Sequence, residues 1–314
     1  MKIAQLIKGG SVAIFGHLRP DGDCVGTALG LYNYIKDNYP EIKADLYLEK
    51  FPESFNMIRY ASEAREFCPF DKIYDTVFVV DTSSEERIGA GGREALKKCG
   101  FSCNIDHHVS NPGNICEVNH VVPDGSSAAE VLYYMLEPDK VSRQCAEALY
   151  LGISHDTGIF KYSSTHRSTL LAVADLIDKG VDFTRIIDET YYHRTLPQTV
   201  VTGFVLMNVK QAIGGKVAYG YLTSEQMKHF GVSSLEMDGI IDAIRELEGN
   251  EVAIFMYPLK GGYKISLRSK NKVDVNVVAS HFSGGGHVKA AGGQAYGDPE
   301  TIIARLCEYI KEQL

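Results

Sequence analysis

Three short apolar segments in the first half of the chain each end beside a histidine or an aspartate. They cover residues 12–15, 76–80 and 101–105, and stretches with helical periodicity, such as 24–38, lie between them. Continuous apolar strands that alternate with helices are typical of a parallel sheet whose two faces are both covered. With a further strand at 44–48, the pattern predicts an α/β fold with a mostly parallel sheet flanked by helices.

Polar side chains follow each of these strands at the point where the strand ends. In open α/β sheets the carboxyl ends of neighbouring strands share one edge, and ligands bind there. Acids and imidazoles buried at that edge without a cation or other partners would be left unsatisfied. The residues concerned are His17, Asp21 and Asp23 after the first strand, Asp81 after the second, and Asp106-His107-His108 after the third.

Each of these groups also has a simpler interpretation. Asp21 and Asp23 could cap the helix that follows them, and Asp81 could close a loop. Taken alone, the tripeptide Asp106-His107-His108 could be a solvated loop with two surface histidines. Their shared position at one edge of a sheet favours a common site.

A fourth group lies in the stretch Gly152–Phe160, where a helix expected over 142–154 breaks into a turn that contains glycines. Asp156 in this turn could approach the cluster at the sheet edge. His155 competes with Asp156 for the same role, and the spacing alone does not decide between them.

The number of candidate ligands indicates more than one metal ion. Four carboxylates and at least two imidazoles exceed the roughly four ligands that a single zinc ion takes. We therefore expect two ions that share a carboxylate. Oxygen-rich ligands with histidine and no thiolate favour Mn²⁺, with Mg²⁺ or Co²⁺ as substitutes. Such two-metal sites activate water for attack at phosphorus, so phosphoester hydrolysis is the expected chemistry.

The second half of the chain predicts a smaller α/β domain. Helices are expected near 197–212 and 237–248, and strands at 251–257 and 263–268 form a predicted hairpin. The pattern breaks around residues 191–197. We predict a metal-binding domain over 1–190, a linker over 191–200 and a substrate-binding domain over 201–314, with the active site in the cleft between the domains.

A glycine run in this second domain, Gly284-Gly285-Gly286, is followed by His287 and preceded by Arg268-Ser269. The N–H groups of consecutive glycines can form an anion-binding nest, and arginine can hold a phosphate through two hydrogen bonds. The alternative is a flexible loop beside an ordinary basic face. The arginine on a strand, the glycine run and the histidine together favour anion binding.

The composition of the chain argues against some classes of binding partner. The net charge is −8 and its acidic excess lies within residues 1–199, which argues against a broad basic face for long duplex DNA. No apolar run approaches the ~18 residues of a membrane span, and Met1–Gly10 lacks a signal-peptide pattern, so no membrane partner and a cytoplasmic location are expected. The seven cysteines lack paired CxxC spacing, which favours reduced thiols.

These residues resemble the DHH phosphoesterase family over nearly the whole chain. His17-x3-Asp21-x-Asp23, Asp81, Asp106-His107-His108 and Asp156 are similar to its four motifs in order. The glycine run with Arg268-Ser269 upstream resembles the DHH-associated domain that follows in one branch. Length and two-part layout are most similar to the nano-RNases and pAp phosphatases, where pAp is 3′-phosphoadenosine 5′-phosphate. Ser283 departs from the pattern, because the family often has glycine there.

The resemblance implies roles for individual residues. Asp106 would orient a histidine, and His108 would face the phosphate, so that His108, Asp106 and Asp81 are the catalytic residues. Two sets of Mn²⁺ ligands would share Asp81: His17, Asp21 and Asp81 for one ion, and Asp23, Asp81, His107 and Asp156 for the other. The implied substrate-binding residues are Arg268, Ser269, Gly284, Gly285, Gly286 and His287.

The resemblance also implies substrates. They are short single-stranded RNA or DNA oligonucleotides and small phosphorylated nucleotides, including pAp and linear dinucleotides such as pApA, and a homodimer is among the expectations. One alternative is a manganese-dependent inorganic pyrophosphatase, which typically carries clustered basic residues in place of the glycine run. Another is a catalytically silent nucleotide-binding regulator, which the complete set of motif residues disfavours.

Overall fold

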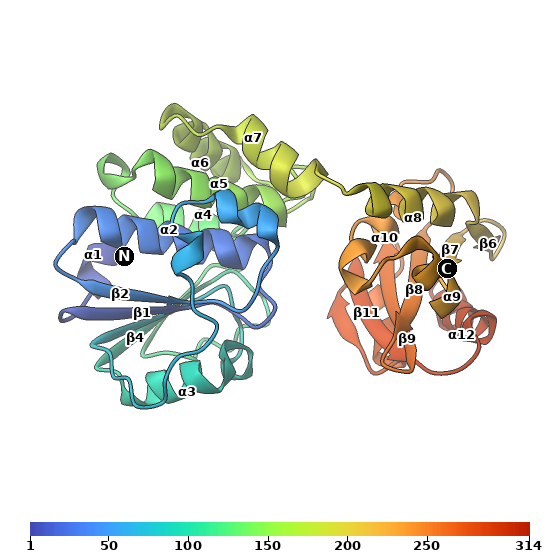
Figure 1. Ribbon diagram of the computed structural model, residues 1–314, viewed down its shortest axis with the longest axis horizontal. Coiled ribbons are helices and arrows are strands. Elements are labelled where there is room, and N and C mark those ends of the chain that lie inside the picture. Colours follow the sequence, from blue (N-terminus) through green and yellow to red (C-terminus); the bar gives the residue numbers. More distant parts are fainter. The chain divides into compact units, whose positions relative to one another are not determined.

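The computed structural model describes the backbone of residues 1–314 and the side chains of all of them except Leu235 and His287. The chain forms two compact units, Met1–His193 and Arg194–Leu314 (Figure 1). Each unit contains its own sheet, and hydrophobic side chains pack on both faces of each sheet. Among the described residues, no helix is both long and apolar enough to cross a membrane.

The first unit is built on a five-stranded sheet in the order β2-β1-β3-β4-β5, and every neighbouring pair of strands is parallel. This confirms the predicted α/β fold. The sequence pattern does not predict β5, because this four-residue strand is half-buried and not continuously apolar. The strands are β1 Ser11–Phe15, β2 Lys43–Tyr47, β3 Thr76–Val80, β4 Phe101–Asp106 and β5 Val118–Val121.

Helices cover both faces of this sheet, as Figure 1 shows. The helices α2 and α4 pack against the face that contains Ile14, Phe78 and Ile105, and α5 and α6 pack on these helices within the same hydrophobic cluster. The helix α3 packs on the face that contains Val77 and Val79. Successive side chains of a strand point to opposite faces, so each strand needs apolar residues throughout. The helices are α1 Ile3–Leu6, α2 Gly22–Asn38, α3 Gly89–Lys98, α4 Ala128–Met135, α5 Arg143–Asp156, α6 Arg167–Asp178 and α7 Phe183–Ile187.

Short turns of other helix types connect these elements. The segment η5 is a π-helical turn that continues α7, and the others are single 3₁₀ turns. Their bounds are η1 Glu53–Met57, η2 Ala61–Glu63, η3 Glu85–Ile88, η4 Pro138–Lys140 and η5 Asp188–Tyr192.

The helices α2 and α5 are in direct backbone contact, and two glycines allow it. A Cβ atom on Gly26 would lie 2.5 Å from the backbone nitrogen of Gly152 and 2.6 Å from the carbonyl oxygen of Ala148. A Cβ atom on Gly152 would lie 2.9 Å from Oδ1 of Asp23. The helix expected over 142–154 runs two residues further, to Asp156, and the turn that contains Gly158 follows it. Gly152 lies inside α5 and serves helix packing.

The second unit contains a six-stranded mixed sheet in the order β10-β11-β9-β8-β7-β6, in which only β7 and β8 pair in parallel. Helices α8 and α10 pack on one face, and α11 and α12 pack on the other. The strands are β6 Lys210–Ala212, β7 Val217–Tyr221, β8 Val252–Leu259, β9 Gly262–Ser269, β10 Gly285–His287 and β11 Ala290–Ala295. The helices are α8 Leu196–Met207, α9 Ser224–Phe230, η6 Ser234–Met237, α10 Ile240–Arg245, α11 Val275–Ser280 and α12 Pro299–Lys311.

Several details of the second unit differ from the sequence expectations. The helix predicted over 197–212 ends at Met207, where Asn208 donates its side-chain amide to Phe204 O, and the following residues form β6. The backbone is already helical from Leu196, inside the segment expected as a linker over 191–200. The sequence pattern also does not predict α9. The second unit therefore contains shorter and more numerous elements than the hydrophobic periodicity of its sequence predicts.

The contact between α2 and α5 gives a testable prediction. We expect Gly26→Ala to lower the free energy of unfolding by about 1–3 kcal/mol, because the new methyl group meets backbone atoms that cannot move aside. Gly10→Ala is the control, because a Cβ atom there has nothing within 4 Å and should change stability by less than about 0.5 kcal/mol. Urea unfolding followed by circular dichroism measures both. Equal stability of Gly26→Ala and wild type would contradict the packing argument.

Candidate metal centre

Three neighbouring strands deliver candidate ligands to one edge of the first sheet. His17 lies just after β1, Asp81 follows β3 directly, and β4 ends at Asp106. The strand order runs outward from β1 in one direction to β2 and in the other to β3. The gap between the ends of β1 and β3 is therefore a topological switch point, the usual position of ligand sites in such sheets.

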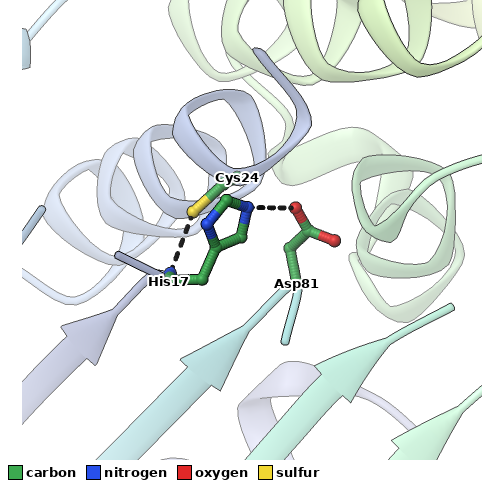
Figure 2. A group of neighbouring side chains, drawn as sticks. All are labelled: His17, Cys24 and Asp81. Atoms are coloured by element: carbon green, nitrogen blue, oxygen red, sulfur yellow. Dashed lines mark hydrogen bonds and ion pairs between the residues drawn. The ribbon is translucent and has the colours of Figure 1, made fainter. Parts of the chain in front are cut away.

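His17 faces two carboxylates. Its Nε2 atom lies 3.5 Å from Oδ2 of Asp81 and 3.8 Å from Oδ2 of Asp21, and Figure 2 shows the imidazole directed at Asp81. The other carboxylate oxygen of Asp21 accepts hydrogen bonds from the backbone N–H groups of Asp23 and Cys24. Asp21 thus caps α2 with one oxygen and faces His17 with the other, so its role as a helix cap leaves one oxygen directed at the candidate metal centre.

His107 faces three carboxylates on the other side of Asp81. Its Nε2 atom lies 3.7 Å from Oδ2 of Asp23, 3.6 Å from Oδ1 of Asp81 and 3.5 Å from Oδ2 of Asp156. Its Nδ1 atom lies 3.2 Å from the carbonyl oxygen of Gly125. A histidine that donates Nδ1–H to a carbonyl presents Nε2 to a metal, which is the common arrangement of histidine ligands.

Asp81 stands between the two histidines and is only 2% exposed. One of its carboxylate oxygens faces His17 and the other faces His107. Its Oδ1 atom is buried without a hydrogen-bond partner among the described residues, and its backbone is left-handed, with φ of +52°. Burial, together with the charges of Asp23 and Asp21, raises the pKa of Asp81 well above its ordinary value.

Asp23 is held by the first turn of another helix. Its two oxygens accept hydrogen bonds from the backbone N–H groups of Ala128, at 2.6 Å, and Ala129, at 3.0 Å, at the start of α4. Thr27 donates its hydroxyl to the same carboxylate. Unpaired N–H groups at a helix start favour a negative charge. Burial nevertheless raises the pKa of Asp23, although the charge of His107 opposes this shift.

The donor set fits divalent cations. Asp156, the last residue of α5, completes the group around His107, and burial together with the charge of Asp23 raises its pKa to about 7. Carboxylates crowded together in a buried site disfavour their own ionisation, and bound cations reverse that effect. Ligand atoms of Asp23, His107 and Asp156, and of Asp81, His107 and His108, lie within 4.8 Å of one another and could hold a metal ion.

Asp106 is fully buried and contacts His108. One of its oxygens lies 2.7 Å from Nδ1 of His108, and the other accepts a hydrogen bond of 2.6 Å from the side-chain amide of Asn111. Burial raises the pKa of Asp106, but these hydrogen bonds outweigh burial and lower it overall. An ionised Asp106 fixes the orientation of the His108 ring. The sequence gives no signal for Asn111, since amides in loops are common.

Cys24 also belongs to the cluster, which the sequence patterns do not indicate. Its sulfur accepts a hydrogen bond of 3.2 Å from the backbone N–H of His17 (Figure 2), and it lies with His17 and Asp81 in a group that could hold a metal. Burial raises the pKa of the Cys24 thiol to about 11. The carboxylates and imidazoles around it remain the expected ligands, because a thiol would first have to lose this proton in order to bind a cation.

His155 does not join the candidate ligands. Its Nε2 atom lies 2.9 Å from the hydroxyl of Thr190, and its ring packs edge-on against Phe55. A Cβ atom on Gly22 would lie 2.3 Å from this ring. Burial lowers the pKa of His155 to about 4, so it is a neutral packing residue. Of the two competitors at the end of α5, the structure brings Asp156 to the cluster.

The candidate substrate-binding residues lie in the second unit, and their contacts within that unit are as follows. Arg268 extends from β9, and its Nε atom lies 3.3 Å from a carboxylate oxygen of Asp242 on α10. Ser269 is 1% exposed, and its hydroxyl donates to Val288 O. The side chain of His287 lies outside the described residues.

The glycine run is part of a strand and does not form the expected nest. Gly285–His287 pair with β11 in antiparallel register. The N–H of Gly284 donates to Ala279 O, and that of Gly286 donates to the side chain of Asn276. A Cβ atom on Gly284 would lie 2.0 Å from the carbonyl oxygen of Gly292. The glycines therefore allow two strands to approach closely, and at least two of their N–H groups are already occupied.

Comparisons with known proteins define the class. Residues 11–153 match the N-terminal domain of the DHH family, and residues 214–313 match the DHHA1 domain. The chain therefore belongs to the DHH family and carries a DHHA1 domain after its metal-site domain. These matches indicate a hydrolase of the phosphoesterase class.

Relatives resemble the chain over nearly its full length. A bifunctional oligoribonuclease and PAP phosphatase NrnA from Thermus thermophilus is 28% identical over 323 residues, which cover 99% of this chain and 93% of the relative. The protein of the same name from Bacillus subtilis is 26% identical, with 96% and 95% covered. The crystal structure of an exopolyphosphatase-related protein from Bacteroides fragilis superposes with a TM-score of 0.88 at 25% identity, covering 96% and 92% of the two chains.

The central position of Asp81 gives a prediction about metal binding. Mn²⁺ at about 100 times its dissociation constant should stabilise the wild type by about 2.7 kcal/mol for each ion bound. We expect Asp81→Asn to lose most of this stabilisation, because both ligand groups share its carboxylate. Thermal unfolding with and without Mn²⁺, and the Mn²⁺ content per chain, measure the effect.

The control for this prediction is Glu94→Gln on α3, which removes a carboxylate that pairs with the surface lysines Lys97 and Lys98. This variant should respond to Mn²⁺ as the wild type does. An Asp81→Asn variant that binds Mn²⁺ with unchanged affinity and amount would show that Asp81 is not a ligand.

Proposed function

We propose that the protein is a Mn²⁺-dependent phosphoesterase that hydrolyses short single-stranded oligoribonucleotides and pAp. Linear dinucleotides such as pApA and short DNA are further substrates of the same chemistry. The observation that carries the proposal is Asp81, a buried carboxylate with one oxygen toward His17 and the other toward His107. A carboxylate that bridges two ligand groups is the central part of a two-metal phosphoesterase site.

The residues divide between two ions. His17, Asp21 and Asp81 would hold one Mn²⁺, and Asp23, Asp81, His107 and Asp156 would hold the other. When bound, the ions supply a polarised water and neutralise charge that develops at phosphorus. The identity of the metal is part of the proposal, and it follows from ligands that are carboxylates and imidazoles.

The chain's own residues orient the reaction. Asp106 fixes His108 through Nδ1 at 2.7 Å, so His108 acts through Nε2. We propose that His108 donates a proton or a hydrogen bond to the leaving oxygen, which is the task of a general acid at a phosphoester. Asn111 holds the second oxygen of Asp106 and keeps this carboxylate from turning away.

The choice of substrate rests on the relatives and on the second domain. The relatives named NrnA act on oligoribonucleotides and PAP, and they align with this chain from end to end. In the DHHA1 domain, Arg268 carries a guanidinium that is suited to a phosphate. Its Nε atom pairs with Asp242 and its Nη1 atom donates to Leu267 O, and these two contacts fix the position of the guanidinium.

The test is hydrolysis of pAp and of labelled RNA of two to five nucleotides in the presence of Mn²⁺. We expect turnover by the wild type and a loss of at least about 10³-fold in Asp81→Ala, since both ion sites are disrupted. Inorganic pyrophosphate is the comparison substrate. Rapid hydrolysis of pyrophosphate with no turnover of either nucleotide substrate would replace the proposal with a pyrophosphatase.

The role of His108 gives a separate prediction. His108→Asn should lower kcat by about 10²–10⁴-fold, the usual contribution of a general acid, and leave the Mn²⁺ content unchanged. Asp106→Asn should lower kcat by a smaller factor, because the ring remains but is less well oriented. Loss of Mn²⁺ from His108→Asn would instead make His108 a ligand.

A further inference from the structure

Arg87 is a cationic side chain at the metal centre that neither the motifs nor the proposed mechanism uses. It lies in η3, and its carbonyl oxygen accepts a hydrogen bond of 2.6 Å from the backbone N–H of Leu18. This bond ties the segment after β3 to the loop after β1. The guanidinium reaches inward, and its Nη2 atom lies 2.9 Å from Nδ1 of His17.

The same ring nitrogen has a second neighbour of opposite character. Nδ1 of His17 lies 3.0 Å from the carbonyl oxygen of Leu18. An arginine only donates hydrogen bonds, and a carbonyl oxygen only accepts them. One imidazole nitrogen cannot accept from Arg87 and donate to Leu18 O at the same time, so the two contacts exclude each other.

A cation on Nε2 of His17 decides between the two contacts. A neutral imidazole that gives Nε2 to a metal carries its proton on Nδ1, and that N–H is normally donated to a carbonyl or carboxylate. Leu18 O would then become the partner of His17. Arg87 would lose this acceptor, and its N–H donors would remain at the edge of the centre.

We propose that Arg87 is a substrate-binding residue, whose guanidinium leaves His17 when a cation binds there and holds the phosphate that is hydrolysed. This inference rests on the proposed function. The centre collects five carboxylates, of Asp21, Asp23, Asp81, Asp106 and Asp156. A phosphate that approaches them needs positive charge beyond the ions, and a guanidinium binds two phosphate oxygens in one plane.

The affinities for inorganic phosphate and for Mn²⁺ test this role, because we expect one variant to weaken the first without weakening the second. Arg87→Met should weaken the binding of inorganic phosphate to the Mn²⁺-loaded protein by about 10- to 100-fold. The same variant should bind Mn²⁺ as tightly as the wild type or up to about 10-fold more tightly, because the contact between Arg87 and His17 no longer has to break. Calorimetric titration of phosphate and of Mn²⁺ measures both values.

Two further variants separate the effect of the positive charge at position 87 from that of the planar guanidinium, and from the general effect of losing an arginine. Arg87→Lys should bind phosphate with intermediate affinity, because it keeps the charge but loses the planar donors. Arg59→Met is the control, since Arg59 pairs with Asp37, about 21 Å along α2 from Asp23. It should change neither affinity.

Two results would overturn the inference. If Arg87→Met binds phosphate like the wild type, Arg87 does not hold the phosphate. If it loses Mn²⁺, Arg87 supports His17 structurally instead of serving the substrate. Turnover of pAp by the wild type is measured alongside: a wild type without turnover refutes the proposed function and this inference together, whereas an active wild type with an unaffected Arg87→Met refutes the inference alone.

Discussion

The rest of the site depends on the carboxylate of Asp81 and on its contacts with two histidines. It is buried, lies at the end of β3 and has a histidine within 3.6 Å of each oxygen. Burial and neighbouring acids raise its pKa, so a negative charge at this position needs a cation close by. The left-handed backbone conformation of Asp81 is unfavourable in free energy for a residue other than glycine, and the surrounding structure holds it in place. Such strained residues are common in functional sites.

The sequence predicts those site residues that lie at the ends of strands. His17, Asp81 and the residues after Asp106 come directly after apolar strands, and parallel strands align their ends at one edge. The pattern also predicts the parallel sheet itself. Because Asp156 ends a helix and does not lie in a turn, its place in the cluster needed the family resemblance as well as the spacing.

The other contacts come from residues far apart in the chain. The N–H groups that hold Asp23 belong to Ala128 and Ala129, and the methyl side chain of alanine does not indicate such a role. Arg87 reaches His17 because two loops are joined by one backbone hydrogen bond. The glycine run was wrongly expected to form a nest, since a run of glycines serves equally for close strand pairing. Only the three-dimensional arrangement separates these uses.

The backbone contact between α2 and α5 has a consequence for ion selection. Asp23 and Asp156 are carried by these two helices, and main-chain atoms at Gly26 and Gly152 set the separation of the helices. The spacing of these two candidate ligands therefore depends on a non-bonded contact between main-chain atoms of the two helices. Ca²⁺, with oxygen distances of about 2.3–2.6 Å against about 2.0–2.1 Å for Mg²⁺, requires a wider cavity. A side chain at Gly26 or Gly152 would push the two helices apart and would shift the spacing of Asp23 and Asp156 toward that of a larger ion.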